Sequence, residues 1–248
     1  MRLQGKVAIV TGAASGFGEG IARRFAAEGA RVVVADLNLT AAQRVASDLG
    51  AVAVGGDVSR GPDVQAIVAA AVQAYGQIDI VVNNAGTTHR NRPMTEVDEA
   101  GFDRVYAVNV KSLYWMMQAV LPVLRRQGRG GSIINIGSTA GIRPRPGLVW
   151  YNGTKAAVNV MTQSMAVELA PENIRVNSVC PVMGVTGLLS EFMGLPDTPE
   201  NRARFLATIP IGRMSTPADV ANACVWLAED ASSFITGILL PVDGGRTA

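Results

Sequence analysis

The stretch KVAIVTGAASGFG, residues 6–18, joins a short apolar run to three closely spaced glycines. Residues 6–11 are branched and almost continuously apolar, which predicts a β-strand covered on both faces. Ile21 and Phe25 lie on one face of a helix predicted over residues 15–28. A strand, a glycine-rich turn and a helix therefore follow one another, and this order predicts one unit of a parallel α/β sheet.

The spacing of the three glycines suits a phosphate-binding turn. Gly12 permits a tight turn, Gly16 lets the backbone approach a pyrophosphate, and Gly18 lets the helix pack close to the strand. The helix N-terminus, with Ser15 and Phe17 beside it, supplies free N–H groups and a positive dipole. Because the glycines lie between a predicted strand and a predicted helix, they indicate a dinucleotide site rather than an ordinary turn.

An acidic residue, Asp36, follows the second predicted strand (residues 31–35) at the place where a carboxylate can bind the adenosine ribose hydroxyls. Its charge would repel the 2′-phosphate of NADP. The next residue is Leu37 rather than arginine, and Ser15 stands where a basic side chain could meet that phosphate. These features favour NAD. The alternative role for Asp36 is a helix cap, although Asn38 or Thr40 can serve in its place.

Apolar runs alternate with helical segments along the rest of the chain. This alternation predicts one doubly wound, Rossmann-type α/β domain over residues 1–248, with a parallel seven-stranded sheet and helices on both faces. Prolines and glycines interrupt the pattern over about residues 183–213, which we interpret as a substrate lid. The remaining strands are predicted at 51–54, 78–82, 132–136, 175–179 and 238–241, and the remaining helices at 40–49, 63–75, 96–126, 151–168 and 217–227.

The full chain resembles the short-chain dehydrogenase/reductase family. TGAASGFG at 11–18 matches the family motif TGxxxGxG, NNAG at 83–86 follows the fourth strand, and YNGTK at 151–155 matches YxxxK. The resemblance implies an oxidoreductase that uses a nicotinamide cofactor and acts on CH–OH groups, with Asn109, Ser138, Tyr151 and Lys155 as its catalytic residues. It implies further cofactor contacts from Asp57, Val58, Asn83, Ala85, Gly86, Pro181, Val182, Gly184 and Thr186.

The chemistry also follows from the residue types. Tyr151 and Lys155 are four residues apart on a helix and so share a face. A tyrosine pKa near 10 is too high for a base, but a neighbouring ammonium and a bound nicotinamide cation would stabilise the phenolate. Tyr151 is thus the candidate acid/base, Ser138 the group that hydrogen-bonds the substrate oxygen, and Lys155 a contact for the nicotinamide ribose. By resemblance, Asn109 holds a water in a proton relay; a local helix hydrogen bond is the alternative.

One segment departs from the family pattern. The family often has Pro-Gly after the sixth strand, whereas Pro181 precedes Val182 here. Together with Gly184, this leaves the local loop geometry open. The backbone of the segment is still expected to contact the nicotinamide carboxamide, and Thr186 stands where a threonine that contacts the cofactor is expected.

Several side chains are candidates for choosing the substrate. His89, the only histidine, either reaches the substrate mouth or lies in a surface loop. Arg143 and Arg145 lie between Ser138 and Tyr151, where they either meet an anionic substrate or form a stiff exposed loop with the neighbouring prolines. Apolar lid residues hint at a hydrophobic substrate, although lids also pack on their own cofactor. The lid residues in question are Met183, Leu188, Leu189, Phe192 and Met193.

Composition excludes some functions. The formal net charge is only +2 and no basic run occurs, so nothing indicates nucleic-acid binding. Cys180 and Cys224 form no metal-binding pair and are expected to be buried thiols, with one disulfide between them as the alternative. We expect no metal site, no signal or membrane segment, and a cytoplasmic location. By resemblance, and because the helical residues 106–118 and 156–165 are unusually apolar, we expect a homotetramer, with a homodimer as the alternative and residues 237–241 as a second interface.

Three functions remain open at this level. The favoured one is an NAD-dependent dehydrogenase or reductase for a small or medium secondary alcohol or ketone. The second is a 3-oxoacyl-carrier-protein reductase; such enzymes usually prefer NADP and dock an acidic carrier on a basic patch, and neither property is indicated here. The third is a dinucleotide-sensing protein without turnover, which the intact Ser138, Tyr151 and Lys155 disfavour.

Overall fold

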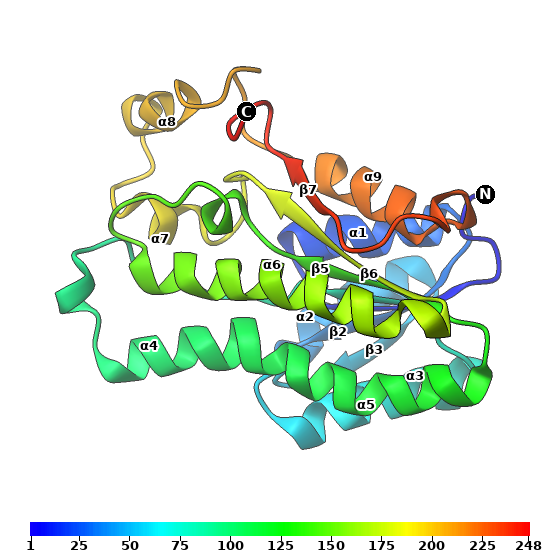
Figure 1. Ribbon diagram of the computed structural model, residues 1–248. Helices are drawn as coiled ribbons and strands as arrows, with labels where there is room; N and C mark the ends of the chain where they lie inside the picture. The colour runs from blue at the N-terminus through cyan, green and yellow to red at the C-terminus, as the bar shows by residue number, and fades with distance from the viewer.

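The computed structural model describes residues 1–248 and contains one seven-stranded parallel sheet, in the order β3-β2-β1-β4-β5-β6-β7 (Figure 1). From β1 the chain builds outward to β3 and then returns to the other side of β1 with β4, so the strand order reverses between β1 and β4. In open sheets of this kind, ligands bind beyond the carboxyl ends of the strands at such a reversal. The strands are β1 Val7–Thr11, β2 Arg31–Asp36, β3 Val52–Gly55, β4 Ile80–Asn83, β5 Gly131–Ile136, β6 Ile174–Pro181 and β7 Leu239–Val242.

Helices cover both faces of the sheet, as the alternating pattern predicted (Figure 1). Two apolar cores fill the spaces between the layers: one joins the sheet to α1, α2 and α9, and the other joins it to α3, α5 and α6. Strand β1 contributes to both, with Val10 in the first and Ile9 in the second. The helices are α1 Gly16–Ala27, α2 Leu39–Leu49, α3 Gly61–Tyr75, α4 Glu99–Tyr106, α5 Ser112–Gln127, α6 Val149–Leu169, α7 Leu189–Met193, α8 Pro199–Leu206 and α9 Pro217–Ala228.

The structure corrects the single helix predicted over residues 96–126. Helix α4 and helix α5 are separated by a π-helical turn, Ala107–Lys111, which contains the buried Asn109. Such turns are uncommon and often mark functional positions. The apolar periodicity continues across the turn, so it gave no sign of the interruption. Most other predicted ends shift by one or two residues.

The segment interpreted as a lid is less irregular than predicted, because it contains α7 and α8. Both lie at the end of the molecule toward which β6 points (Figure 1). Leu189 and Met193 of α7 pack with Met214 in a small apolar cluster. The segment is therefore anchored by its own buried contacts as well as facing the cavity described below.

Some sequence expectations concern the rest of the molecule. Cys180 and Cys224 are buried free thiols, which confirms that prediction. Every helix is too short or too polar to cross a membrane.

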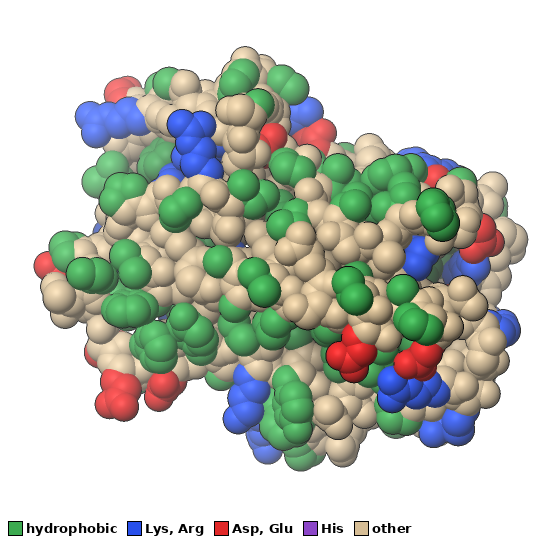
Figure 2. Space-filling view, in the orientation of Figure 1, with side chains coloured by type: hydrophobic (Ala, Val, Ile, Leu, Met, Phe, Trp, Pro, Cys, Tyr) green, Lys and Arg blue, Asp and Glu red, His purple; other side chains and the backbone are tan.

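Apolar side chains lie exposed on α5 and α6: Tyr114 is 54% exposed, Val160 62% and Val167 80%. Figure 2 looks onto this face, where hydrophobic side chains spread across α6 and the helices below it.

Candidate active site

A cavity of about 710 Å³ opens at the carboxyl ends of the strands and runs from the glycine turn to the lid. It brings together residues from α1, β2, β5, α6, β6, α7 and α8 that are far apart in the sequence. Gly18, Asn83 and Asn109 alone among the predicted site residues lie outside its wall. The predicted residues that line it are Gly12, Ser15, Gly16, Phe17, Asp36, Leu37, Asp57, Val58, Ala85, Gly86, Ser138, Tyr151, Lys155, Pro181, Val182, Gly184 and Thr186.

The glycine turn leaves room for a phosphate by geometry that side chains would block. Gly12 and Gly16 have φ values of +62° and +57°, in the left-handed region that favours glycine. A Cβ added to Gly18 would lie 2.0 Å from the carbonyl oxygen of Gly12, so this glycine allows α1 to approach β1. Ser15 precedes α1 without forming a side-chain cap. The first N–H groups of α1 therefore fit a pyrophosphate at the cavity wall.

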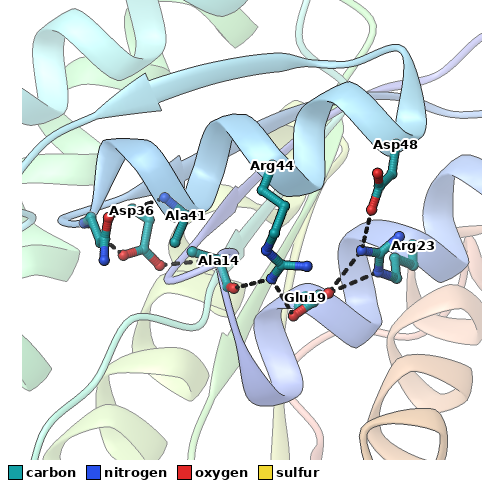
Figure 3. A network of polar contacts seen from close by, with 8 residues as sticks. Ala14, Glu19, Arg23, Asp36, Ala41, Arg44 and Asp48 are labelled. Atoms are coloured by element: carbon teal, nitrogen blue, oxygen red, sulfur yellow. Dashed lines mark hydrogen bonds and ion pairs between the residues drawn. The ribbon is translucent and has the colours of Figure 1, made fainter.

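Asp36 ends β2 beside this turn and is held there by two backbone amides. Its carboxylate accepts hydrogen bonds from the N–H groups of Ala14, at 3.0 Å, and Asn38, at 2.9 Å (Figure 3). Asn38 caps α2 by accepting from the N–H of Ala41, so Asp36 is free of the capping role. Leu37 is 75% exposed and forms the neighbouring wall of the cavity.

An arginine that sequence reasoning missed lies near the same turn. Arg44 of α2 directs Nη2 to the carbonyl oxygen of Ala14 and to Oε2 of Glu19, both at 3.4 Å (Figure 3). Glu19 also accepts from Arg23, which pairs with Asp48 in turn. The Arg44 guanidinium is thus partly balanced by a carboxylate and does not line the cavity.

Tyr151 lies at the other end of the cavity, on the first turn of α6. It is 7% exposed, and its ring packs edge-on against Phe192 with the centroids 5.0 Å apart. Burial raises the pKa of Tyr151 to about 12, while the neighbouring Ser138 hydroxyl and the charge of Arg145 act in the opposite direction. Ser138 follows β5 and accepts from the N–H of Ala140 at 3.0 Å. The structure therefore places Ser138 and Tyr151 together in one wall.

Lys155 lies one turn further along α6 and is 6% exposed. Its Nζ donates to the carbonyl oxygen of Ile136 at 2.8 Å and lies 5.9 Å from the centroid of the Tyr151 ring. Burial lowers the pKa of Lys155 to about 8. We expected this ammonium and a bound nicotinamide cation to stabilise the phenolate, and that role stays a prediction. In the structure the ammonium is directed to a backbone carbonyl, and Ser138 and Arg145 also favour the phenolate.

Asn109 stands behind the cavity wall with its amide fully engaged. Its Oδ1 accepts from the N–H of Thr87 at 2.8 Å, and its Nδ2 donates to the carbonyl of Thr87 and to Oγ1 of Thr154. These partners are distant in sequence, so the alternative of a local helix hydrogen bond is wrong. A Cβ on Gly86 would lie 3.4 Å from Asn109 Oδ1 and 3.7 Å from Lys155 Nζ, which places both side chains beside Gly86.

The NNAG motif contributes differently from the expectation. Asn83 lies outside the cavity wall and donates its amide to Oδ1 of Asn135 on the neighbouring strand. Asn84, which we did not single out, lines the cavity and donates to the carbonyl oxygens of Thr11 and Gly12 at 2.8 and 3.0 Å. It therefore fastens the end of β4 to the glycine turn.

Only some of the side chains predicted to choose the substrate line the main cavity. His89 is only 5% exposed, which excludes the surface-loop alternative, but it lies outside the main cavity and borders a smaller one of about 310 Å³. Arg143 and Arg145 both line the main cavity. Arg246, which the sequence did not suggest, lines it too. Apolar walls complete this end, with contributions from Met183, Leu148, Leu188, Phe192, Phe205, Ile209 and Met214.

Comparisons with known proteins agree with this geometry. The family model described as enoyl-(acyl carrier protein) reductase matches residues 12–247. Over 99% of both chains, the sequence is 52% identical to 4-formylbenzenesulfonate dehydrogenase from Comamonas testosteroni and 40% identical to a 3-oxoacyl-[acyl-carrier-protein] reductase from Thermotoga maritima.

A solved structure has nearly the same fold as this chain. The 3-ketoacyl-(acyl-carrier-protein) reductase from Brucella melitensis, complexed with NADH, superposes with a TM-score of 0.94 at 44% identity. The match covers 99% of this chain and all of that chain. The fold is thus shared, over almost the full length of the chain, with a reductase whose structure contains NADH.

Proposed function

The chain belongs to the short-chain dehydrogenase/reductase family, and on that basis we propose that it transfers a hydride between NAD(H) and a secondary alcohol or ketone, with Tyr151 as the acid/base. That it is an oxidoreductase with a nicotinamide dinucleotide follows from the family. The observation that carries the finer proposal is that Ser138, Tyr151 and Lys155 line the same cavity as the glycine turn and Asp36.

The protein residues divide the work of ketone reduction. When bound, NADH would supply the hydride for the carbonyl carbon. Tyr151 donates its phenolic proton to the carbonyl oxygen, and Ser138 hydrogen-bonds the same oxygen as negative charge develops on it. The phenolate then recovers a proton through Lys155, with Asn109 holding the relay behind it. Alcohol oxidation uses the same groups in reverse.

The surroundings of Tyr151 suit this role. With a pKa of about 12 its phenol is protonated at neutral pH and is ready to act as the acid. Three neighbours favour the phenolate that forms: the Ser138 hydroxyl, the Arg145 charge and the positive charge of an oxidised nicotinamide. Burial keeps water away from the transferred proton. The same residue can thus serve as acid in one direction and as base in the other.

The adenosine end supports NAD over NADP. Asp36 presents a carboxylate at the end of β2, where it would bind ribose hydroxyls and repel a 2′-phosphate. Arg44 is directed to Glu19 and Ala14 rather than to the cavity. The glycine turn and the N-terminus of α1 would hold the pyrophosphate. The remaining predicted cofactor contacts follow the same path: Ser15, Phe17, Leu37, Asp57, Val58, Ala85, Gly86, Pro181, Val182, Gly184 and Thr186.

A second candidate is the oxidation of an aromatic aldehyde, which the name of the 52% identical relative suggests. A hydrated aldehyde has a carbon that bears both hydrogen and hydroxyl, so Tyr151 and Ser138 can act on it as they act on an alcohol. A 3-oxoacyl-carrier-protein reductase remains the alternative in the same family. A dinucleotide sensor without turnover remains the alternative of another class.

For the assembly, we propose a cytoplasmic homotetramer held by the exposed apolar faces of α5 and α6. Tyr114, Val160 and Val167 support an interface there, since exposed apolar side chains that gather on one face commonly mark one. Residues 1–248 would act as one catalytic unit, with 183–213 as its lid. Gel filtration with light scattering tests the assembly, and a stable monomer would contradict it.

The experiment that tests the function follows the oxidation of NADH and NADPH with a panel of ketones, diketones, keto-sugars and a 3-oxoacyl thioester. The reverse assay reduces NAD with alcohols and with 4-formylbenzenesulfonate. We expect turnover with NADH and a small ketone or its alcohol. A clear preference for NADPH with the oxoacyl thioester would replace the proposal with the alternative reductase, and NADH binding without any turnover would favour the sensor.

A further inference from the structure

A cationic group stands at the substrate end of the cavity without a carboxylate partner. Arg145 lies between Ser138 and Tyr151 in the sequence, and its side chain is partly buried. Its guanidinium stacks on the ring of Phe205 in α8, with Cζ 5.2 Å from the ring centroid. It forms no salt bridge, unlike nine other cationic side chains of the chain. A charge partly removed from water and left unpaired is costly, so its position calls for an explanation.

Two further arginines line the same end. Arg143 donates from Nη1 to the carbonyl oxygen of Arg246 at 2.8 Å, and Arg246 directs Nη1 to the carbonyl of Thr208 at 3.4 Å. Asp243 is the carboxylate that acts on Arg246. It is occupied, however, because it accepts from the N–H of Gly245 and from both the N–H and the hydroxyl of Thr247. We call Arg143, Arg145 and Arg246 the arginine cluster.

The three charges act on one another. Burial and the Arg246 charge lower the pKa of Arg145, and burial and the Arg143 charge lower that of Arg246. The cavity wall has only two acidic residues, Asp36 and Asp57, and both belong to the adenosine end. The substrate end is therefore positive, with apolar and aromatic walls around it.

From this arrangement we propose that the arginine cluster, and Arg145 in particular, binds an anionic group on the substrate. The class of substrate is a compact apolar alcohol or carbonyl compound that carries a carboxylate or sulfonate away from the reacting carbon. The Arg145 guanidinium can bind either group through paired hydrogen bonds. The apolar wall, including Leu148, Phe192 and Met214, would cover the body that joins the two ends.

The cofactor phosphates do not account for these charges. The pyrophosphate has its place at the glycine turn, and a 2′-phosphate would lie near Asp36, whereas the Arg145 charge acts on Tyr151. This effect of the Arg145 charge on Tyr151 leaves one competing role, in which Arg145 only favours the phenolate. That role predicts equal effects on neutral and anionic substrates, so a matched pair of substrates separates the two.

The inference rests on the proposed function, and the experiment compares 4-acetylbenzoate with acetophenone in NADH-dependent reduction. The two ketones differ only in the carboxylate. We expect the wild type to prefer 4-acetylbenzoate in kcat/KM, and Arg145→Gln to lower that preference by about tenfold to hundredfold, the range for a lost hydrogen bond to a charged group. Arg145→Lys should restore part of the preference because it keeps the charge.

Arg204→Gln is the matched control. Arg204 lies exposed on α8, outside the cavity wall, and its replacement removes the same charge beside Phe205, the residue on which Arg145 stacks. It should leave the preference for 4-acetylbenzoate unchanged. If Arg145→Gln lowers kcat/KM for both ketones by the same factor, or if it behaves as Arg204→Gln does, the anion site is refuted.

A binding assay keeps the inference independent of turnover. Quenching of NADH fluorescence in the protein–NADH complex measures the Kd of each ketone. Tighter binding of 4-acetylbenzoate that Arg145→Gln abolishes supports the anion site even if neither ketone is reduced, in which case only the proposed function fails. Turnover or binding of acetophenone with no preference for 4-acetylbenzoate overturns the anion site and leaves the proposed function standing.

Discussion

Replacing Asp36 by serine should exchange the cofactor preference. The carboxylate would bind ribose hydroxyls through charge-assisted hydrogen bonds, each of which contributes about 1.5–3 kcal/mol. Losing one such bond raises the Kd for NADH by about 10- to 150-fold. NADPH should be affected in the opposite direction, because the charge that opposes its 2′-phosphate is gone. The ratio of the two Kd values should therefore change by about 100-fold or more.

The assay is fluorescence titration of each variant with NADH and with NADPH. Because Asp36 also accepts from the N–H groups of Ala14 and Asn38, urea unfolding of the same samples shows whether the turn is kept. Asp48→Ser is the matched control, since Asp48 pairs with Arg23 in the same network but lies outside the cavity wall (Figure 3). A folded Asp36→Ser protein whose affinities for NADH and NADPH fall by equal factors would refute the reasoning.

Two further predictions concern buried groups. Lys155→Met should lower kcat by at least 100-fold in the ketone assay. The same substitution should raise the unfolding free energy of the cofactor-free protein at pH 7. Burial lowers the pKa of the Lys155 ammonium to about 8, so keeping the buried ammonium charged costs the folded protein about 3 kcal/mol. The folded chain releases the Lys155 proton near pH 8, whereas the unfolded chain keeps it up to the ordinary pKa of 10.5. The stability gained by Lys155→Met should therefore shrink as the pH rises from 8 to 10.5. A difference in unfolding free energy between variant and wild type that stays constant over this pH range, measured by urea unfolding, would contradict this. Gly18→Ala should destabilise the fold by about 1–3 kcal/mol, because its Cβ would meet the Gly12 carbonyl at 2.0 Å. Gly187→Ala, where a Cβ meets nothing within 4 Å, should leave the urea midpoint almost unchanged, and equal effects of the two substitutions would contradict the close packing of α1 on β1.

The parts of the fold that follow from local patterns could be predicted. Branched apolar runs gave the seven strands, and the glycine turn gave the first crossing from strand to helix. The π-helical turn at Asn109 escaped prediction because the apolar periodicity runs through it. Helices α7 and α8 escaped because the residues between and at their ends, Gly194, Pro196 and Pro199, also mark loops.

In the site, too, local spacing could be predicted but contacts between distant segments could not. Tyr151 and Lys155 could be placed on one helix face by their spacing. The direction of the Lys155 ammonium, however, is set by the carbonyl of Ile136 at the end of β5, which the spacing does not indicate. Arg246 lies about 100 residues beyond Arg145, and only the pairing of β7 with β6 brings it to the cavity. Side chains that converge through the sheet order cannot be grouped from sequence spacing alone.

The central claim is that Tyr151 transfers the proton, and Tyr151→Phe tests it most directly. The substitution removes one hydroxyl and keeps the ring against Phe192, so the fold and the cofactor site should persist. The measurement is kcat for the preferred ketone or alcohol together with the Kd for NADH. The account predicts a loss of kcat of about 10²- to 10⁴-fold with the Kd within threefold of wild type. A Tyr151→Phe protein that binds NADH and turns over at the wild-type rate would contradict it.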